Sequence, residues 1–221
     1  MTYLLFLFMS FMNILSVNAQ TSYAVYTGDD NRLTFYHDGK KSSRSGVVME
    51  LNDLDNQPEW NSYSDKITSV VFDSSFANAR PSCTYRWFSG MSNLISITGI
   101  EYLNTSDVTV MTNMFSGCRG LKSINVSSFD TGNVTNMSGM FSDCSGLTSI
   151  DVGKFNTSKV LLLFGMFSHC SSLTSINVSS FDTSNVIDMS SMFLRCSSLT
   201  SIDLSNFNTE STLKSRSARP H

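Results

Sequence analysis

The stretch MFSGCRGLKSINVSSFDT, residues 114–131, decides the fold because it recurs almost unchanged along the chain. Four copies are marked by Cys118, Cys144, Cys170 and Cys196, which lie 26 residues apart. Self-similarity at a fixed period of roughly 20–50 residues is typical of proteins in which each repeat packs only on its neighbours. The sequence therefore predicts a stack of repeats, an architecture that more often presents a long binding surface than encloses an active site.

Each repeat contains a segment of the form Leu-x-x-Ile-x-[Val/Leu], whose last apolar positions alternate with polar ones. Such alternation indicates a β-strand. Weaker copies of the segment precede the cysteine-bearing ones. We therefore expect six strands that stack as a parallel sheet, beginning at Ile67, Leu94, Leu121, Leu147, Leu173 and Leu199.

The other half of each repeat changes its period. Val134, Met137, Met140 and Phe141 are spaced as one face of a short helix requires. The residues just before them, Asp130 to Asn133, are of the types that cap a helix. We therefore expect a short helix in each repeat, on the face opposite the sheet.

Residues 20–66 do not repeat. The segments Tyr23–Tyr26 and Leu33–Tyr36 flank a stretch rich in Gly, Asp and Asn, which predicts a β-hairpin. A repeat stack needs a terminal unit over its first repeat. We expect residues 20–66 to be a β-rich N-terminal cap, with a small independent domain as the alternative, and residues 67–209 to hold the repeats.

Residues 1–19 have the character of a signal peptide, because Tyr3 to Val17 is almost entirely apolar and cleavage after Ala19 suits the type. No other stretch of the sequence is apolar enough to span a bilayer, which takes about 20 residues. We therefore expect a secreted or cell-surface protein with no membrane span after signal removal. Residues 210–221 are polar and basic, and a disordered tail is expected there.

The residues after Thr209 break the repeat pattern, which requires a segment like Ser184–Phe193 at that point. A truncated, non-functional gene product or a short secreted form would each explain the break. The last repeat would then lack a polar cap, and an uncapped edge of this kind favours self-association.

Composition argues against several functions. The net charge is −3 and only 15% of the residues are charged, so the basic surface that nucleic acid requires is missing. The three histidines are scattered along the chain, and no catalytic grouping or phosphate loop stands out from the repeats. We expect no enzyme activity and no cofactor.

The repeat closely resembles that of a known family, the BspA-like leucine-rich repeat surface proteins of bacteria. The matching residues are FDTSNVIDMSSMF at 181–193, Cys196, and LTSIDL at 199–204. The resemblance covers about residues 65–209. It implies an α/β fold: a right-handed leucine-rich-repeat-like solenoid of about six rungs, with an N-terminal β-hairpin cap. It also implies a surface-exposed or secreted protein that acts in adhesion, host contact or protein binding.

The cysteine column of Cys118, Cys144, Cys170 and Cys196 has three interpretations. Its even spacing would place the four thiols in a line, which does not suit one tetrahedral metal site. Disulfides between neighbouring repeats are geometrically possible. A buried column of reduced thiols is favoured, since cysteine packs as a small apolar residue.

Two surfaces are candidate binding sites. Polar residues occupy the outward positions of the predicted strands and form a candidate ligand face: Ser123, Asn125, Ser149, Asp151, Ser175, Asn177, Ser201 and Asp203. The third cysteine-bearing repeat carries Leu161, Leu162 and Phe164 where its predecessor has Thr, Asn and Ser, a candidate apolar contact patch. For the polar face, the alternative is that small polar residues merely suit an exposed sheet. For the apolar residues, the alternatives are sequence drift and a longer cap segment that lies over them.

We therefore expect a secreted or surface module that binds a protein or glycan on a host or neighbouring cell. The alternative is a structural component that self-assembles without a specific ligand.

Overall fold

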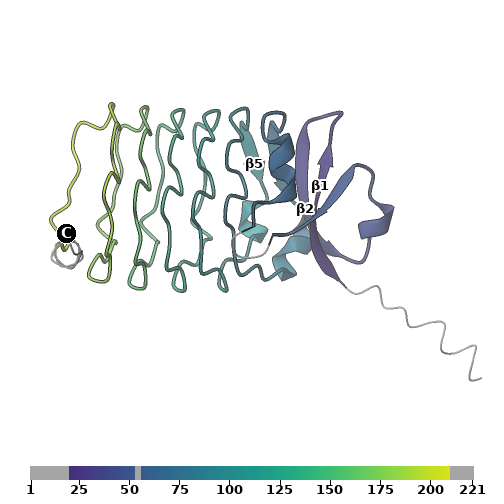
Figure 1. Ribbon diagram of the computed structural model, residues 1–221, viewed down its shortest axis with the longest axis horizontal. Coiled ribbons are helices and arrows are strands. Elements are labelled where there is room, and N and C mark those ends of the chain that lie inside the picture. Colours follow the sequence, from purple (N-terminus) through teal and green to yellow (C-terminus); the bar gives the residue numbers. More distant parts are fainter. Residues whose placement is uncertain (1–19, 53–55, 210–221) are drawn as a thin grey trace, which may run out of the picture.

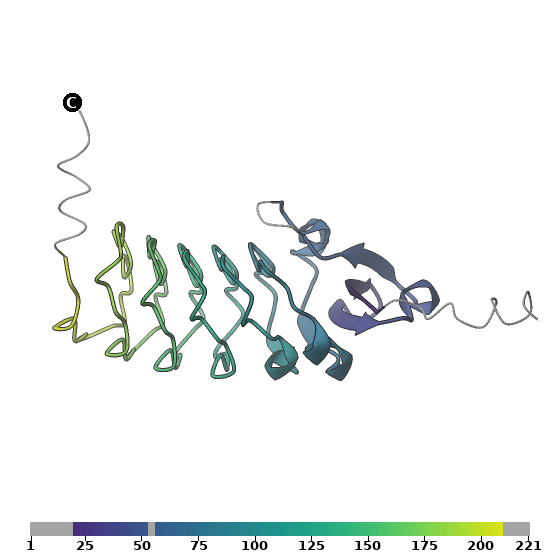
Figure 2. The same cartoon turned by 90° about the horizontal axis from the view of Figure 1, so that it is seen from below.

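The computed structural model describes residues 20–52 and 56–209. It shows a mixed β-sheet at one end, from which a row of similar coils extends to Thr209 (Figure 1). A view turned by 90° shows the same succession of coils lying side by side (Figure 2). The predicted signal peptide and basic tail lie outside the described residues.

The sheet has five strands in the order β3-β1-β2-β4-β5. The antiparallel strands β1 and β2 form the predicted hairpin, and β3 pairs with the other side of β1. The pairs β2–β4 and β4–β5 are parallel. The strands span Thr21–Thr27 (β1), Arg32–Asp38 (β2), Val47–Glu50 (β3), Ser69–Phe72 (β4) and Ser96–Thr98 (β5).

All helices among the described residues are short 3-10 helices in the N-terminal part of the chain. Asp73 begins η3 by accepting a hydrogen bond of 2.9 Å from the Ser75 N–H. Gly99 precedes η4 with a φ of +69°, and a Cβ there would collide with the Phe72 carbonyl oxygen. The helices span Lys41–Ser43 (η1), Glu59–Tyr63 (η2), Ser74–Asn78 (η3) and Ile100–Tyr102 (η4).

The predicted right-handed leucine-rich-repeat-like solenoid is wrong. What the structure has instead is a five-stranded mixed sheet confined to residues 21–98, and the described repeats after Tyr102 contain neither a helix nor an extended strand. Of the six predicted strands, only those expected at Ile67 and Leu94 have counterparts, in β4 and β5.

The leucine-bearing segments fail as strands because few backbone hydrogen bonds link them. Between the segments at Leu121 and Leu147 the backbone bond is that from Thr148 N–H to Lys122 O, at 3.0 Å. The next is Thr174 N–H to Thr148 O, at 3.3 Å. A parallel sheet requires an evenly spaced ladder of such bonds, so apolar alternation alone did not make a strand here.

The predicted helices fail because half of their N–H groups bond to the next repeat. Met140 and Ser142 donate to the carbonyls three residues earlier, as in a tight turn. Met137, Gly139 and Phe141 instead donate to carbonyls of the following repeat, at 2.8–3.0 Å. An α-helix would keep all of these bonds within itself. Successive turns bury apolar residues at the same spacing but leave every second backbone N–H to bond to the neighbouring coil.

Most of these bonds between coils run in one direction, although a few, such as Thr135 N–H to Thr109 O and Ile187 N–H to Leu161 O, run the other way. In each repeat, four alternate N–H groups point toward the following repeat and four carbonyls point toward the preceding one. The first such set joins Thr84, Arg86, Phe88 and Gly90 to the repeat of Val110, and the same pattern continues to Leu194. Isolated parallel bridges mark one column of this ladder: Cys83, Val110, Asn136, Leu162 and Asp188.

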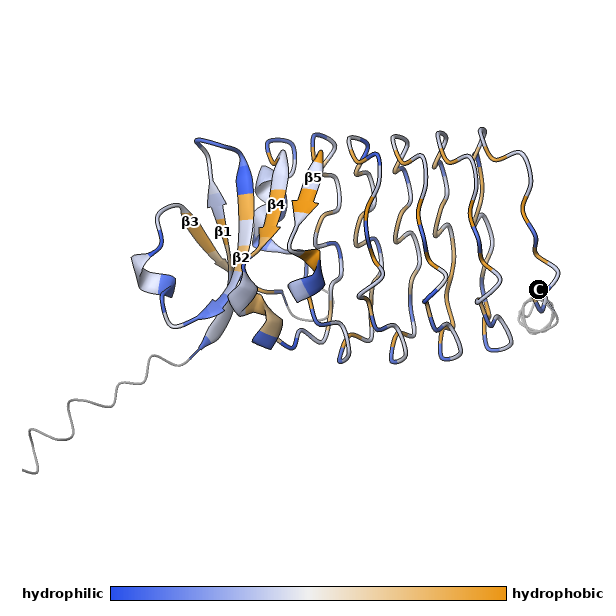
Figure 3. Cartoon of the chain, turned by 180° about the vertical axis from the view of Figure 1, so that it is seen from behind, coloured by the Kyte–Doolittle hydropathy of each residue, from blue (hydrophilic) through white to orange (hydrophobic). Residues whose placement is uncertain are grey.

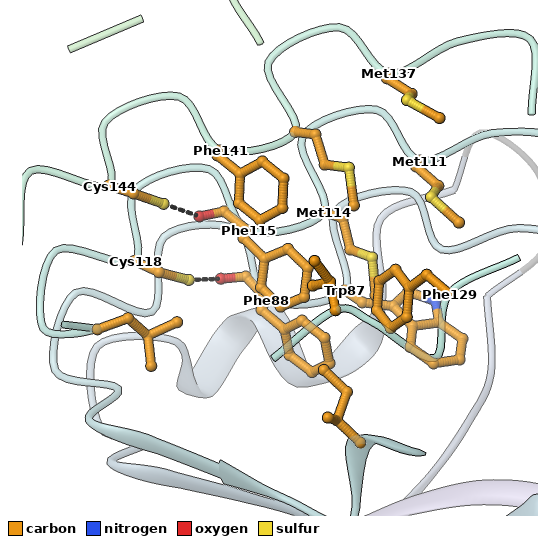
Figure 4. Close-up of a cluster of buried hydrophobic side chains, with 14 of the residues drawn as sticks. Trp87, Phe88, Met111, Met114, Phe115, Cys118, Phe129, Met137, Phe141 and Cys144 are labelled. Atoms are coloured by element: carbon orange, nitrogen blue, oxygen red, sulfur yellow. Dashed lines mark hydrogen bonds between the residues drawn. The ribbon is translucent and has the colours of Figure 1, made fainter. Parts of the chain in front are cut away.

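Columns of like side chains fill the interior. Phe88, Phe115, Phe141, Phe167 and Phe193 stack with ring centroids 5.1–5.6 Å apart. Met111, Met114 and Met137 are buried beside them (Figure 4). One apolar cluster runs from Ala24 in β1 to Cys196, and apolar residues recur at matching places in successive coils (Figure 3).

Phe35 in β2 joins the sheet to this column. Its ring stacks on Phe72 at 4.7 Å and on Trp87 at 5.1 Å, and meets Trp60 edge-on at 5.3 Å. Trp60 Nε1 also donates to Trp87 O at 2.6 Å, and Asn52 Nδ2 donates to Tyr85 O at 3.2 Å. Side chains of residues 20–66 thus satisfy carbonyls of the first coil, which has no preceding coil to supply donors.

Candidate functional site

The candidate ligand face lies on the surface, although not on a sheet. All eight of its residues are exposed, from Ser123 in the first cysteine-bearing repeat to Asp203 in the last. The hydroxyls of its four serines have no hydrogen-bond partner within residues 20–52 and 56–209. The face therefore offers two parallel columns of polar groups, with one pair of groups from each of four consecutive repeats.

The Asn and Asp residues of this face also have a structural role. Asn125 Oδ1 accepts a hydrogen bond from the Ser127 N–H at 3.0 Å, and Asp151 Oδ1 accepts one from the Gly153 N–H at 2.9 Å. The same turn recurs at Asn177 and Asp203. Side chains of this type hold a tight turn by bonding two residues ahead. At Asp203 the backbone and side chain of Ser205 lower the pKa of the carboxyl group.

Asparagine and aspartate alternate strictly along this column, in the order Asn125, Asp151, Asn177, Asp203. A second column of such turns alternates in the same way: Asn104, Asp130, Asn156 and Asp182. Neighbouring coils lie only about 5 Å apart, where two carboxylates would repel each other. The alternation of Asn and Asp keeps the turn in every coil, because both side chains accept the same hydrogen bond, and it places successive carboxylates two coils apart. Reading the sequence by column would have revealed this pattern.

The cysteine column lies in the core. Cys118, Cys144, Cys170 and Cys196 are buried and are present as free thiols. Each Sγ donates to a phenylalanine carbonyl of the preceding coil: Cys118 to Phe88 O at 3.1 Å, and Cys144 to Phe115 O at 3.1 Å (Figure 4). The thiols thus replace a backbone donor between coils. Within the described part of the chain, no three potential metal ligands cluster.

Burial also makes these thiols poor nucleophiles. Desolvation raises the pKa of the Cys118 and Cys170 thiols far above the ordinary value, and it raises that of Cys144 as well. At Cys196 burial also raises the pKa of the thiol, and a hydrogen bond with the Cys170 backbone partly opposes this shift. Because the thiolate is the reactive form, the column suits a packing role rather than chemistry.

A buried threonine column went unnoticed in the sequence. Thr105, Thr131, Thr157 and Thr183 are at most 2% exposed. Each hydroxyl donates to a carbonyl of the next coil, as Thr157 Oγ1 does to Asp182 O at 2.9 Å. The same oxygen accepts a bond of 2.8 Å from the Asp182 N–H. A Thr directly after the Phe-[Asp/Asn] pair of each cysteine-bearing repeat was the available signal.

The candidate apolar patch does not behave as one unit. Leu161 and Phe164 are 43% and 50% exposed, whereas Leu162 is half-buried in the column of parallel bridges. Leu161 shares a column with Ile187, whose N–H donates to Leu161 O at 2.8 Å. Phe164 instead lines a hollow together with Leu194 of the next coil. The sequence did not single out Ile187 or Leu194.

A histidine and an aspartate lie close together in the column beside the cysteines. His169 Nδ1 is 3.3 Å from Asp143 Oδ1, and both side chains are partly exposed. Arg119 and Arg195 line the same surface depression. His169, Asp143 and Arg195 all have a positive φ, which shows that this position belongs to the turn that precedes each cysteine.

Two overlapping stretches, residues 84–177 and 151–217, match a protein family described as "Mycoplasma protein of unknown function, DUF285". Together they span more than half of the chain. The chain belongs to this family. The DUF285 match covers all four cysteine-bearing repeats and therefore both candidate surfaces. No curated protein and no solved structure matches the chain significantly.

None of the helices among the described residues is long and apolar enough to cross a membrane.

Proposed function

We propose that this DUF285 protein is a secreted or cell-surface module that binds a protein or glycan on a host or neighbouring cell. The observation that carries the proposal is the candidate ligand face, Ser123 to Asp203, whose eight side chains are exposed in four consecutive coils. Serine hydroxyls that the described fold does not use recur there once per coil, at about 5 Å spacing. A row of identical weak contacts suits multivalent binding.

The sequence pattern supports the surface location. The apolar stretch Tyr3–Val17 has the length of a signal-peptide core. The repeat resembles that of the BspA-like leucine-rich repeat surface proteins, whose members act in adhesion. We extend that resemblance to location and role.

Self-assembly without a ligand is the alternative function, and the direction of the backbone ladder argues against it. In the last described coil the N–H groups of Met189, Ser191, Phe193 and Arg195 have no acceptor among residues 20–52 and 56–209. Two such faces would set donors against donors. Head-to-tail pairing would need the carbonyls of the first coil, and Trp60 and Asn52 already occupy two of them, Trp87 O and Tyr85 O. The purified chain should therefore sediment as a monomer.

The test of the binding function compares two variants with the same added charge. Lysine at Ser149 and Ser175 places bulk and charge at the centre of the candidate ligand face. Lysine at Thr109 and Ile187, which are exposed in a different column, is the matched control. Both variants and the unaltered chain are displayed on cells, and their retention on a panel of cultured cells is measured by flow cytometry.

We expect the Ser149/Ser175 variant to lose retention and the control to keep it. Equal retention by all three proteins would place binding elsewhere on the molecule. Absence of retention of the unaltered chain on every cell type of the panel would reject the proposed function.

A further inference from the structure

The hollow beside Phe164 departs from the repeat pattern in a way that the fold does not require. Its two apolar walls are Phe164 and Leu194, which come from adjacent coils and are each 50% exposed. The residues equivalent to Phe164 in the other cysteine-bearing repeats are Thr112, Ser138 and Ser190, and those equivalent to Leu194 are Ser116, Ser142 and Ser168. Both substitutions by apolar residues therefore fall on the same hollow, and neither side chain fills the core.

The rest of the lining is small, polar and uncharged. The hollow is also lined by Asn113, Ser138, Ser142, Ser168 and Ser191, and by the two glycines Gly139 and Gly165, called the floor below. The Asn113 side chain lies over Gly139, where a Cβ would collide with its Oδ1. No hydrogen-bond partner is found within the described chain for the hydroxyls of Ser138, Ser168 and Ser191. These groups remain available to a ligand.

The backbone of the floor is not available. Gly139 N–H donates to Phe164 O at 2.8 Å, and Gly165 N–H donates to Ser190 O at 3.0 Å. A peptide that binds by adding a strand requires free backbone donors and acceptors, so the floor does not favour one. No charged side chain lines the hollow, which gives no advantage to an ionic ligand.

The geometry points to a neutral sugar as the ligand: we propose that this hollow binds a pyranose unit of an uncharged glycan. A pyranose ring has an apolar C–H face, which suits the exposed ring of Phe164, and a rim of hydroxyls that can both donate and accept. Binding sites commonly combine apolar walls with a few placed polar groups, and hydroxyl and amide side chains offer both hydrogen-bonding roles. The inference rests on the proposed binding function, adds this hollow to the candidate ligand face as a second site, and names the class of ligand that the hollow binds.

Reversion to the residue of the neighbouring repeat gives variants that should fold. Phe164→Ser and Leu194→Ser restore the serine found in the preceding repeat at each position. Ile187→Thr is the matched control, because Ile187 is 46% exposed, lies outside the hollow, and Thr109 and Thr135 occupy its column. Thermal melting of each variant checks the fold independently of binding.

The full chain is titrated with maltohexaose, cellohexaose and chitohexaose, and binding is followed by ligand-observed NMR and calorimetry. We expect at least one hexasaccharide to bind, with affinity reduced about ten-fold or more by Phe164→Ser, reduced less by Leu194→Ser, and unchanged by Ile187→Thr. Failure of all three sugars to bind, or equal affinity of the unaltered chain and Phe164→Ser, overturns the proposal.

A second measurement separates this proposal from the binding function itself. Retention of the unaltered chain is compared on intact cells and on cells whose glycans have been oxidised with periodate. Loss of retention after oxidation supports the glycan site. Retention that survives oxidation, and that Phe164→Ser does not change, rejects the glycan site but leaves the proposed cell-binding function standing.

Discussion

The N-terminal region and the repeats hold themselves together in different ways. Residues 20–102 use a mixed sheet and an aromatic cluster centred on Phe35, in which no two contacts are alike. Residues 103–209 use columns of like side chains and a backbone ladder in which most bonds point in one direction. The first region defines a unique end for the molecule, whereas the second adds the same interface at each coil.

This difference has a consequence for stability. In a stack whose coils contact only their neighbours, stability is a sum of local terms, so coils can separate independently. A sheet with contacts between distant segments loses its structure all at once. Both tryptophans of the chain, Trp60 and Trp87, lie in the N-terminal region, so their fluorescence reports on that region alone.

The largest effect is expected when one aromatic ring is removed from each region, which tests whether the two regions unfold independently. Phe35→Ala and Phe141→Ala each delete a fully or almost fully buried aromatic side chain, at a cost of about 3–5 kcal/mol. We expect Phe35→Ala to shift the tryptophan and circular-dichroism unfolding curves together. Phe141→Ala should instead lower the dichroism midpoint while tryptophan fluorescence changes little, because the coils beyond it separate first.

Phe141→Leu controls for the loss of aromatic stacking and should separate the two curves much less. Coincident curves for Phe141→Ala would show that the repeats and the sheet unfold as one unit, and the distinction drawn between the two regions would then be wrong.

A smaller effect is expected from the threonine column. Thr157→Val keeps the shape of the side chain but removes the hydroxyl that serves both Asp182 O and the Asp182 N–H. Loss of partners for buried polar groups costs about 1–3 kcal/mol. Urea unfolding followed by circular dichroism should show this loss. Thr148→Val is the control, because Thr148 is exposed and its removal should change stability by less than about 0.5 kcal/mol.

The sequence predicted which side chains are buried better than it predicted the backbone that buries them. The spacing of Val134, Met137, Met140 and Phe141 marked the core correctly, because inward positions recur every three or four residues in a helix and in successive tight turns alike. The choice between the two depends on where alternate N–H groups bond, and those acceptors lie 25 residues away. That information is not local, so the helices were predicted wrongly.

The candidate surfaces show the same limit. Exposure of the polar face follows from alternation within each repeat and was anticipated. The hollow beside Phe164 was not anticipated, because its two apolar residues, Phe164 and Leu194, come from two adjacent coils. Phe164 was already recognised as a departure from the preceding repeat, and the same comparison with the residue 26 positions earlier would have identified Leu194 as well.

The charge alternation of the Asn/Asp columns can be tested by breaking it. Asn156→Asp keeps the turn to Ser158 but sets three carboxylates in a row with Asp130 and Asp182. We expect the melting temperature to fall by about 1–2 °C at low salt, as weak surface electrostatics predicts, and to recover in 0.5 M salt by screening. In an Asp182→Asn background the same change should have less effect. A fall that salt does not reverse would point to a distorted turn instead of repulsion.

The smallest effect concerns the N-terminal region, where the ion network around Asp38 has no counterpart in the repeats. Burial alone would raise the pKa of Asp38, but hydrogen bonds from Tyr23 OH at 2.5 Å and the Lys40 N–H, with Arg44 at 2.6 Å, outweigh it and lower the pKa. A carboxyl group whose pKa is lower in the folded state stabilises the fold above its unfolded pKa of about 3.9, and this contribution is lost as the pH falls through the folded value. Asp38→Asn should therefore be less stable than the unaltered chain at pH 7, and the difference in tryptophan-monitored unfolding should shrink below about pH 4. The network lies in the sheet region, so the unfolding of the coils, followed by circular dichroism, should have the same pH dependence in Asp38→Asn as in the unaltered chain. If the pH dependence of the dichroism signal changes as well, the sheet and the coils are coupled through β4 and β5 more tightly than the backbone ladder implies.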